Sequence, residues 1–239
     1  MKIKVLYEDK DILAIDKPSG VLAHPDKIAE GRTILDWARK KYPKAELAHR
    51  LDRETSGVML IAKNEKAHGA LKKQFQERVV KKIYNAIVSG SFRNDRGMIN
   101  KPIGRSPRDF RRYLAGRGAR GEMREAITEY RVLKHLRIKT DQKQIDPDIS
   151  VNQKGISIIG SFTFLEVKPK TGRTHQIRVH MKYINHPVAC DSLYNPAGMC
   201  PPGFKRLALH AKSIEFKNLK GETIKVESSL PKEFKELTR

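Results

Sequence analysis

The residues best suited to chemistry lie in the string from His49 to Gly57, which reads His-Arg-Leu-Asp-Arg-Glu-Thr-Ser-Gly. Its single aspartate, Asp52, has an arginine on each side, at positions 50 and 53. Nearby positive charge favours the ionised carboxylate, so Asp52 could act as a nucleophile or base at neutral pH. The alternative is a structural role, because most aspartates in such turns only bind backbone N–H groups.

The elements around this string would hold it in place. The apolar run Val58 to Ala62 follows directly and predicts a buried strand, with Asp52 on a loop at the mouth of a sheet. A second candidate, Tyr84, lies in the predicted strand Lys82 to Gly90. Taken alone, a strand tyrosine is more often part of the core than part of a site.

A third string runs from Thr171 to His180 and reads Thr-Gly-Arg-Thr-His-Gln-Ile-Arg-Val-His. It predicts a helix from His175 to about Ile184, with His175, Arg178 and Lys182 on one shared face. The two histidines are five residues apart, which suits a metal pair poorly. We expect no metal site and no cofactor.

Together these strings resemble the motifs of the RluA-type RNA pseudouridine synthases, which isomerise uridine in RNA. The stretches Glu125 to Tyr130 and Arg206 to Ala211 fit further motifs of that family. The resemblance implies that Asp52 is the catalytic residue and that Tyr84 lies against the target base. It also implies that Arg178 forms a salt bridge with Asp52. Whether Asp52 acts at C1′, at C6 or on a sugar proton stays open.

A further set of residues is expected to bind the substrate. The leucines are expected to wall the uracil pocket, and Arg50 to fill the stack that a flipped-out uridine leaves. The set consists of Arg50, Arg173, His175, Gln176, Leu207, Leu209, Arg111 and Arg112.

The resemblance implies an α+β pseudouridine synthase fold, with a long, mixed, mostly antiparallel sheet, flanking helices and a central RNA-binding cleft. We expect residues 1–239 to form a single catalytic domain. The S4 RNA-binding domain that many relatives carry is not expected, since the catalytic pattern begins near residue 9. One departure is Cys190-Asp191, where the family commonly has Gly-Asp.

The charge balance indicates a polyanionic partner. The 239 residues carry a formal net charge of +22, and 32% of them are charged. Neutralising RNA phosphates is the obvious use of such an excess, although a merely solvated basic surface is the alternative. Residues 93–124 are expected to form a basic arm that becomes ordered on RNA, and its densest basic stretch is 105–124. Residues 137–155 are expected to be an exposed connector.

The remaining expectations concern the protein's surroundings. No apolar run approaches the roughly 20 residues that a membrane helix needs. The two cysteines, Cys190 and Cys200, are expected to be reduced thiols in a cytoplasmic monomer. Large-subunit ribosomal RNA is favoured over transfer RNA as substrate. The alternatives are a non-catalytic RNA-binding or ribosome-assembly protein on the same fold, and a glycosidase acting on small nucleosides.

Overall fold

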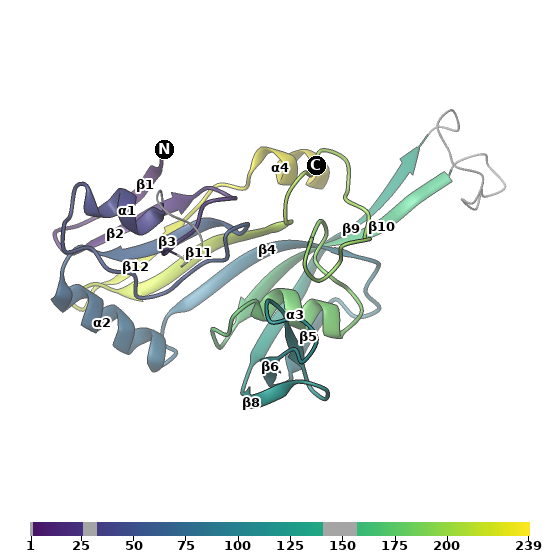
Figure 1. Cartoon of the computed structure of the whole chain (residues 1–239). Coiled ribbons are helices and arrows are strands. Elements are labelled where there is room, and N and C mark those ends of the chain that lie inside the picture. Colours follow the sequence, from purple (N-terminus) through teal and green to yellow (C-terminus); the bar gives the residue numbers. More distant parts are fainter. Residues whose placement is uncertain (1, 26–32, 141–156) are drawn as a thin grey trace. The chain divides into compact units, whose positions relative to one another are not determined.

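The structure is a computed structural model that describes residues 2–25, 33–140 and 157–239 (Figure 1). The chain divides into two compact units. Unit 1 consists of Met1–Asn85, Lys168–His175 and Leu209–Leu230, and unit 2 consists of Ala86–Val167, Gln176–Ala208 and Pro231–Arg239. The single domain and the central cleft stay predictions.

Nine strands share one sheet, in the hydrogen-bonded order β1-β2-β3-β11-β4-β10-β9-β5, with β12 paired to β11. The strands are β1 (Lys4–Glu8), β2 (Ile12–Lys17), β3 (Ser56–Ala62), β4 (Lys81–Ser89), β5 (Arg96–Asn100), β9 (Ile127–Thr140), β10 (Ser157–Pro169), β11 (Leu209–Lys217) and β12 (Thr223–Glu227). The pair β3–β11 is parallel, whereas β1–β2, β2–β3, β5–β9 and β11–β12 are antiparallel. The expected mixed, mostly antiparallel sheet is therefore confirmed.

In unit 1, both faces of β2 and β3 are buried, because successive strand residues point to opposite faces. One face packs against α2 (Glu65–Gln76) and the other against α1 (Ile34–Arg39) (Figure 1). The α2 side includes Ile12, Ala14, Val58, Leu60, Ala67 and Leu71. The α1 side includes Leu13, Ile15, Met59, Ile61, Ile34 and Leu35. Because both faces of β3 are packed in the core, this strand holds the start of the adjoining loop firmly in place.

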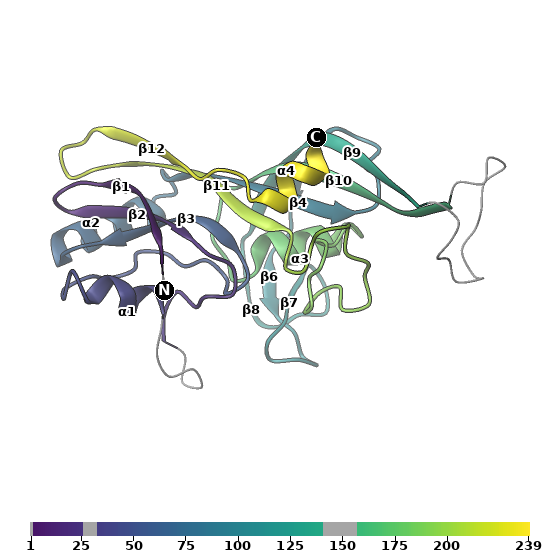
Figure 2. The same ribbon diagram turned by 90° about the horizontal axis from the view of Figure 1, so that it is seen from above.

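In unit 2, residues 93–124 are more regular than expected. They contain β5 and a separate three-stranded sheet of β6 (Ile103–Arg105), β7 (Tyr113–Ala115) and β8 (Arg120–Arg124) (Figure 2). The expectation of an arm without structure of its own is wrong. Its strands are only three to five residues long, which is too short for an apolar alternation that sequence reasoning could detect.

The same small sheet packs on α3 (Gln176–Tyr183) through one apolar cluster. The cluster consists of Ile103, Ala115, Ala126, Val179 and Tyr194. Unit 2 also contains α4 (Lys232–Thr238), whose buried Phe234 contacts the rings of Phe164 and Phe204.

The expected connector at 137–155 is partly wrong, because β9 continues to Thr140 and includes residues 137–140. The rest of that prediction lies outside the described residues. Within the described parts of the chain, no helix is long and apolar enough to span a membrane. In those same parts, no cluster of three or more His, Cys, Asp or Glu side chains could hold a metal ion.

Candidate active site

The loop that carries Asp52 is anchored by a buried lysine. Lys17, at the end of β2, is 0% exposed, and its Nζ donates to the carbonyl oxygens of Pro18 at 2.8 Å and Arg53 at 2.9 Å. A buried ammonium is costly unless hydrogen-bonded, so this lysine fixes the residue next to Asp52 in place.

The turn after Lys17 adds further bonds to the same loop. The backbone N–H of Gly20 donates to the carbonyl of Arg53 at 2.8 Å, and the hydroxyl of Ser19 donates to the carbonyl of Glu54 at 2.6 Å. Within the loop, the N–H of Thr55 donates to the carbonyl of Asp52 at 3.1 Å. The backbone on the C-terminal side of Asp52 is therefore held by a second segment.

The Ser-Gly end of the first string meets the last string along the parallel β3–β11 pair. Ser56 lies opposite His210 and Gly57 opposite Ala211, and the Ser56 hydroxyl is 2.9 Å from Nδ1 of His210. Gly57 has φ +110°, and a Cβ there would lie 2.2 Å from the Ala211 carbonyl oxygen. Only glycine fits this position, because both the backbone conformation and the close strand exclude a side chain.

His49 has a structural role in this string. Its Nε2 accepts the N–H of Leu60 at 2.9 Å, and its ring stacks on Phe75 with centroids 4.7 Å apart. Burial, and then the nearby charge of Lys82, lower the pKa of His49 to about 3. The neutral imidazole is therefore an acceptor that ties the start of the string to β3.

Asp52 lies close to His175 within unit 1, with Nε2 of the imidazole 4.0 Å from Oδ1 of the carboxylate. The side chains are 24% and 19% exposed, so both are reachable from solvent. The expected shared helical face is wrong for His175, because α3 begins at Gln176 and His175 has φ +55°. This left-handed turn, and not helical periodicity, directs the imidazole to Asp52.

Tyr84 lies on β4 and packs against the core cluster on the α1 side of unit 1. Burial raises its pKa above the usual 10.0, and the charge of Asp52 raises it further. At neutral pH the phenol is therefore protonated, and the negative charge of Asp52 helps to keep it so.

Lys82 precedes Tyr84 by two residues, so both side chains point to the same face of β4. Its Nζ donates to the carbonyl of Thr171 at 3.1 Å, and burial lowers its pKa to about 8. Lys82 thereby holds the start of the third string beside the strand that carries Tyr84.

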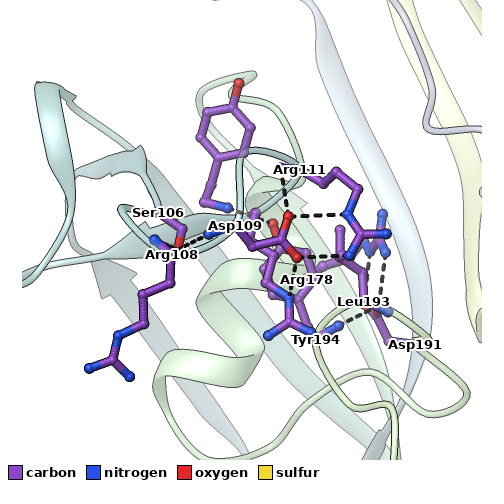
Figure 3. A network of polar contacts seen from close by, with 10 residues as sticks. Ser106, Arg108, Asp109, Arg111, Arg178, Asp191, Leu193 and Tyr194 are labelled. Atoms are coloured by element: carbon purple, nitrogen blue, oxygen red, sulfur yellow. Dashed lines mark hydrogen bonds and ion pairs between the residues drawn. The ribbon is translucent and has the colours of Figure 1, made fainter.

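In unit 2, Arg178 forms a buried bidentate ion pair with Asp191 (Figure 3). Nε and Nη2 each lie 2.8 Å from one carboxylate oxygen, and the side chains are 6% and 0% exposed. Asp191 also accepts the backbone N–H groups of Leu193 and Tyr194, both at 3.0 Å. The guanidinium is thus fixed in orientation, whereas its expected salt bridge with Asp52 stays a prediction.

The residue before Asp191 is Cys190, which stands where the resemblance led us to expect glycine. Cys190 has φ +56°, a left-handed conformation that glycine adopts without strain. Cys190 is bonded to Cys200, with Cα atoms 5.0 Å apart, so the expectation of two reduced thiols is wrong in this structure. The pairing depends on the tertiary turn at 190–200, which cysteine spacing alone does not predict.

Two residues of the third string bind β9. Gln176 donates its amide to the Ile127 carbonyl and the Thr128 hydroxyl, both at 3.0 Å, and Nδ1 of His180 lies 2.9 Å from that hydroxyl. Thr128 and His180 are 0% exposed, and Gln176 is 4% exposed. These contacts support α3, and substrate binding by Gln176 stays a prediction.

The other expected substrate contacts differ in exposure. Arg50 is exposed, Arg173 is partly buried, and Leu207 and Leu209 are buried. Arg111 makes a bidentate pair with Asp109, at 2.9 and 3.1 Å (Figure 3). Arg112 lies 3.5 Å from the same carboxylate. Asp109 therefore offsets part of the charge that was expected to contact phosphates. Their roles in binding stay predictions.

Sequence reasoning missed Lys17, Lys82 and Asp191 as residues that position the site. The sequence did contain a hint for Lys17, because a charged lysine is unusual at the end of a buried strand, just before a proline. For Lys82, the two-residue spacing from Tyr84 could have indicated that both side chains lie on the same face of the strand. Nothing in the sequence paired Asp191 with Arg178.

The chain is similar to known proteins both in sequence and in structure. A family model described as RNA pseudouridylate synthase matches residues 11–183. Ribosomal large subunit pseudouridine synthase D of Xanthomonas campestris pv. campestris is 35% identical, over 98% of this chain and 68% of that protein. The protein of the same name from Vibrio cholerae serotype O1 is 33% identical, over 100% and 70%. Among solved structures, human RNA Pseudouridylate Synthase Domain Containing 1 matches with a TM-score of 0.75 and 26% identity, over 96% of this chain and 84% of that one.

Proposed function

Because the chain belongs to the RNA pseudouridylate synthase family and is an isomerase that acts on RNA, we propose that its substrates are uridines of large-subunit ribosomal RNA. The names of the two bacterial relatives support this choice of RNA. The net charge of +22 suits a large, structured polyanion. Transfer RNA is the less favoured substrate, and a cytoplasmic monomer stays an expectation.

The reaction breaks the bond between C1′ and N1 of uridine, turns the base and joins C1′ to C5. It consumes no redox equivalent, and a carboxylate suits the electron-poor anomeric carbon, as in retaining glycosidases. The observation that carries the proposal is the rigid presentation of Asp52. Lys17, Ser19 and Gly20 hold the following backbone, and the carboxylate lies 4.0 Å from His175.

We propose that Tyr84 takes part in the last step, in which C5 of the rejoined base loses its proton. Its raised pKa makes the phenol a poor source of phenolate, so it can accept the proton from C5 only while its own proton leaves. Asp52 is the charged neighbour that affects this phenol, and we propose it as the acceptor. The ring itself offers the target base an aromatic face.

The test uses purified protein, large-subunit ribosomal RNA transcripts and mapping of pseudouridine at single-nucleotide resolution. The proposal expects one or a few modified uridines with the wild-type protein and none with Asp52→Asn. The same sites should lose pseudouridine in cells that lack the protein. Modification of transfer RNA only, or turnover by a folded Asp52→Asn variant, would contradict it.

A further inference from the structure

The tip of the small sheet in unit 2 carries an aromatic side chain that its fold does not use. Phe110 is 80% exposed, more than any other large apolar residue in the described parts of the chain. Scattered exposed apolar residues are ordinary on protein surfaces, so exposure alone decides nothing. What distinguishes Phe110 is the loop that presents it and the charge around that loop.

The loop between β6 and β7 is closed by its own hydrogen bonds. Ser106 donates its N–H to the carbonyl of Arg112 at 3.0 Å, and Arg112 donates its N–H to the carbonyl of Asp109 at 3.0 Å. The Ser106 hydroxyl accepts the N–H groups of Arg108 and Asp109, at 3.3 and 3.4 Å. The loop is therefore shaped before any ligand binds.

Asp109 completes this arrangement from inside the turn. Its carboxylate accepts the backbone N–H of Arg111 at 2.9 Å and holds the guanidinium of the same residue (Figure 3). These bonds lower the pKa of Asp109 to about 2, so the turn keeps them at neutral pH. Phe110 lies between these two residues and takes no part in the network.

The surrounding charge indicates what would cover the ring. Four arginines of the same segment are exposed, and among the described residues they form no ion pair: Arg105, Arg108, Arg117 and Arg120. A solvent-exposed aromatic ring on a segment rich in unneutralised guanidinium groups is the combination that binds unpaired nucleotides, through base stacking and phosphate contacts. A protein partner would instead need an acidic surface to face these arginines.

We propose that Phe110 is a stacking platform for an unpaired base of the RNA substrate, held ready by the Ser106–Arg112 loop. The inference rests on the proposed function and deepens it, because it predicts that the bound RNA has an unpaired nucleotide away from the target uridine. A preformed loop loses little entropy on binding, so one ring can contribute measurably.

The test measures binding of a hairpin RNA with an unpaired loop, and of the matching fully paired duplex, over a range of salt concentrations. Phe110→Ala should weaken binding of the hairpin by roughly 5- to 150-fold, from the usual energy of base–aromatic stacking, with little effect on the duplex. Its salt slope should stay at the wild-type value, because no phosphate contact is lost. Phe110→Trp should bind as tightly as wild type, with its indole fluorescence changed by the RNA.

Two control variants separate stacking from other effects. Arg108→Gln should flatten the salt slope by about 0.7 to 0.9 if it loses one phosphate contact. Met98→Ala removes another exposed apolar side chain of unit 2, 63% exposed, and should leave binding unchanged. All variants should unfold at the wild-type temperature.

Equal binding by Phe110→Ala and wild type would overturn the inference, and so would equal losses on hairpin and duplex. A change in self-association without a change in RNA binding would assign the ring to a protein contact and also overturn it. The wild-type protein is assayed for pseudouridine in ribosomal RNA in parallel. Failure of that assay rejects the proposed function, whereas an active wild type with an unaffected Phe110→Ala rejects only the platform.

Discussion

Arg178 and Asp191 form a bidentate pair with both contacts at 2.8 Å, and Asp191 is 0% exposed. The pair joins α3 to the turn after Cys190, two segments that sequence reasoning left unconnected. Removing one partner of a buried pair leaves an uncompensated charge. We therefore expect Asp191→Asn to reduce the free energy of unfolding by about 3 to 5 kcal/mol, measured by urea denaturation.

The matched control is Asp109→Asn, which weakens an arginine–carboxylate pair at the surface of the same unit. Arg111 is 63% exposed there, so solvent screens the pair and stability should hardly change. Equal destabilisation by both substitutions would show that burial is not what makes the Arg178–Asp191 pair important.

Lys17→Met should uncouple the loop of Asp52 from β2. The substitution keeps the apolar stem and removes the donor to the carbonyl oxygens of Pro18 and Arg53. We expect kcat to fall at least about 100-fold, because a misplaced reacting group loses most of its advantage, while RNA binding persists. The measurement is single-turnover pseudouridine formation together with RNA affinity.

Lys63→Met is the matched control, because Lys63 also donates a hydrogen bond from its Nζ to a backbone carbonyl. Lys63 donates to the carbonyl of Asp9 at 2.7 Å and lies just after β3, at the end opposite Ser56. Its loss should lower stability without changing kcat. A similar fall in kcat would mean that the effect of Lys17→Met is general destabilisation.

Tyr84→Phe should separate binding from chemistry. The ring stays against the core cluster, but the hydroxyl that the proposed C5 deprotonation uses is gone. RNA affinity should stay within about twofold, and turnover should fall by roughly 100-fold or more, as for other lost general acids and bases. A wild-type rate would leave Tyr84 a packing or stacking residue only.

The low pKa of His49 predicts a pH dependence of stability. Its folded-state pKa is about 3 against an ordinary 6.5, so between these values the unfolded chain binds the proton and the folded chain does not. The free energy of unfolding should therefore fall as pH drops below 6.5, by up to about 1.4 kcal/mol per pH unit for one such group. The measurement is urea denaturation between pH 7 and 5.

His49→Gln tests the assignment, since an amide oxygen can still accept the N–H of Leu60 but does not titrate in this range. The slope between pH 5 and 6.5 should become shallower by up to one proton. His180, whose pKa burial also lowers, adds to the wild-type slope and remains in the variant. An unchanged slope would show that folding does not lower the pKa of His49.

Arg50→Ala tests how the target uridine becomes accessible. Arg50 is exposed, with no ion pair among the described residues, and its flat guanidinium could replace a base that leaves the stack. Flipping costs a few kcal/mol in a paired helix and less in an unpaired strand. Activity should therefore fall more on structured RNA than on an unpaired oligonucleotide, and equal losses would count against the role.

Local patterns predicted what depends on near neighbours in the chain. The apolar run after the first string is β3, as predicted. Burial of that strand follows from its apolar composition alone. The fold class and the family were likewise readable from the strings themselves.

The structure alone decided the contacts between distant segments. His175 reaches Asp52 through a left-handed turn, Lys17 binds the carbonyl of Arg53, and Arg178 pairs with Asp191. Such contacts depend on how the chain closes loops, and periodicity carries no information on that. The sequence by itself determined which residues have the chemistry. Tertiary packing decided which partner each of them binds, because a buried polar group must pair with a group that the fold brings near it.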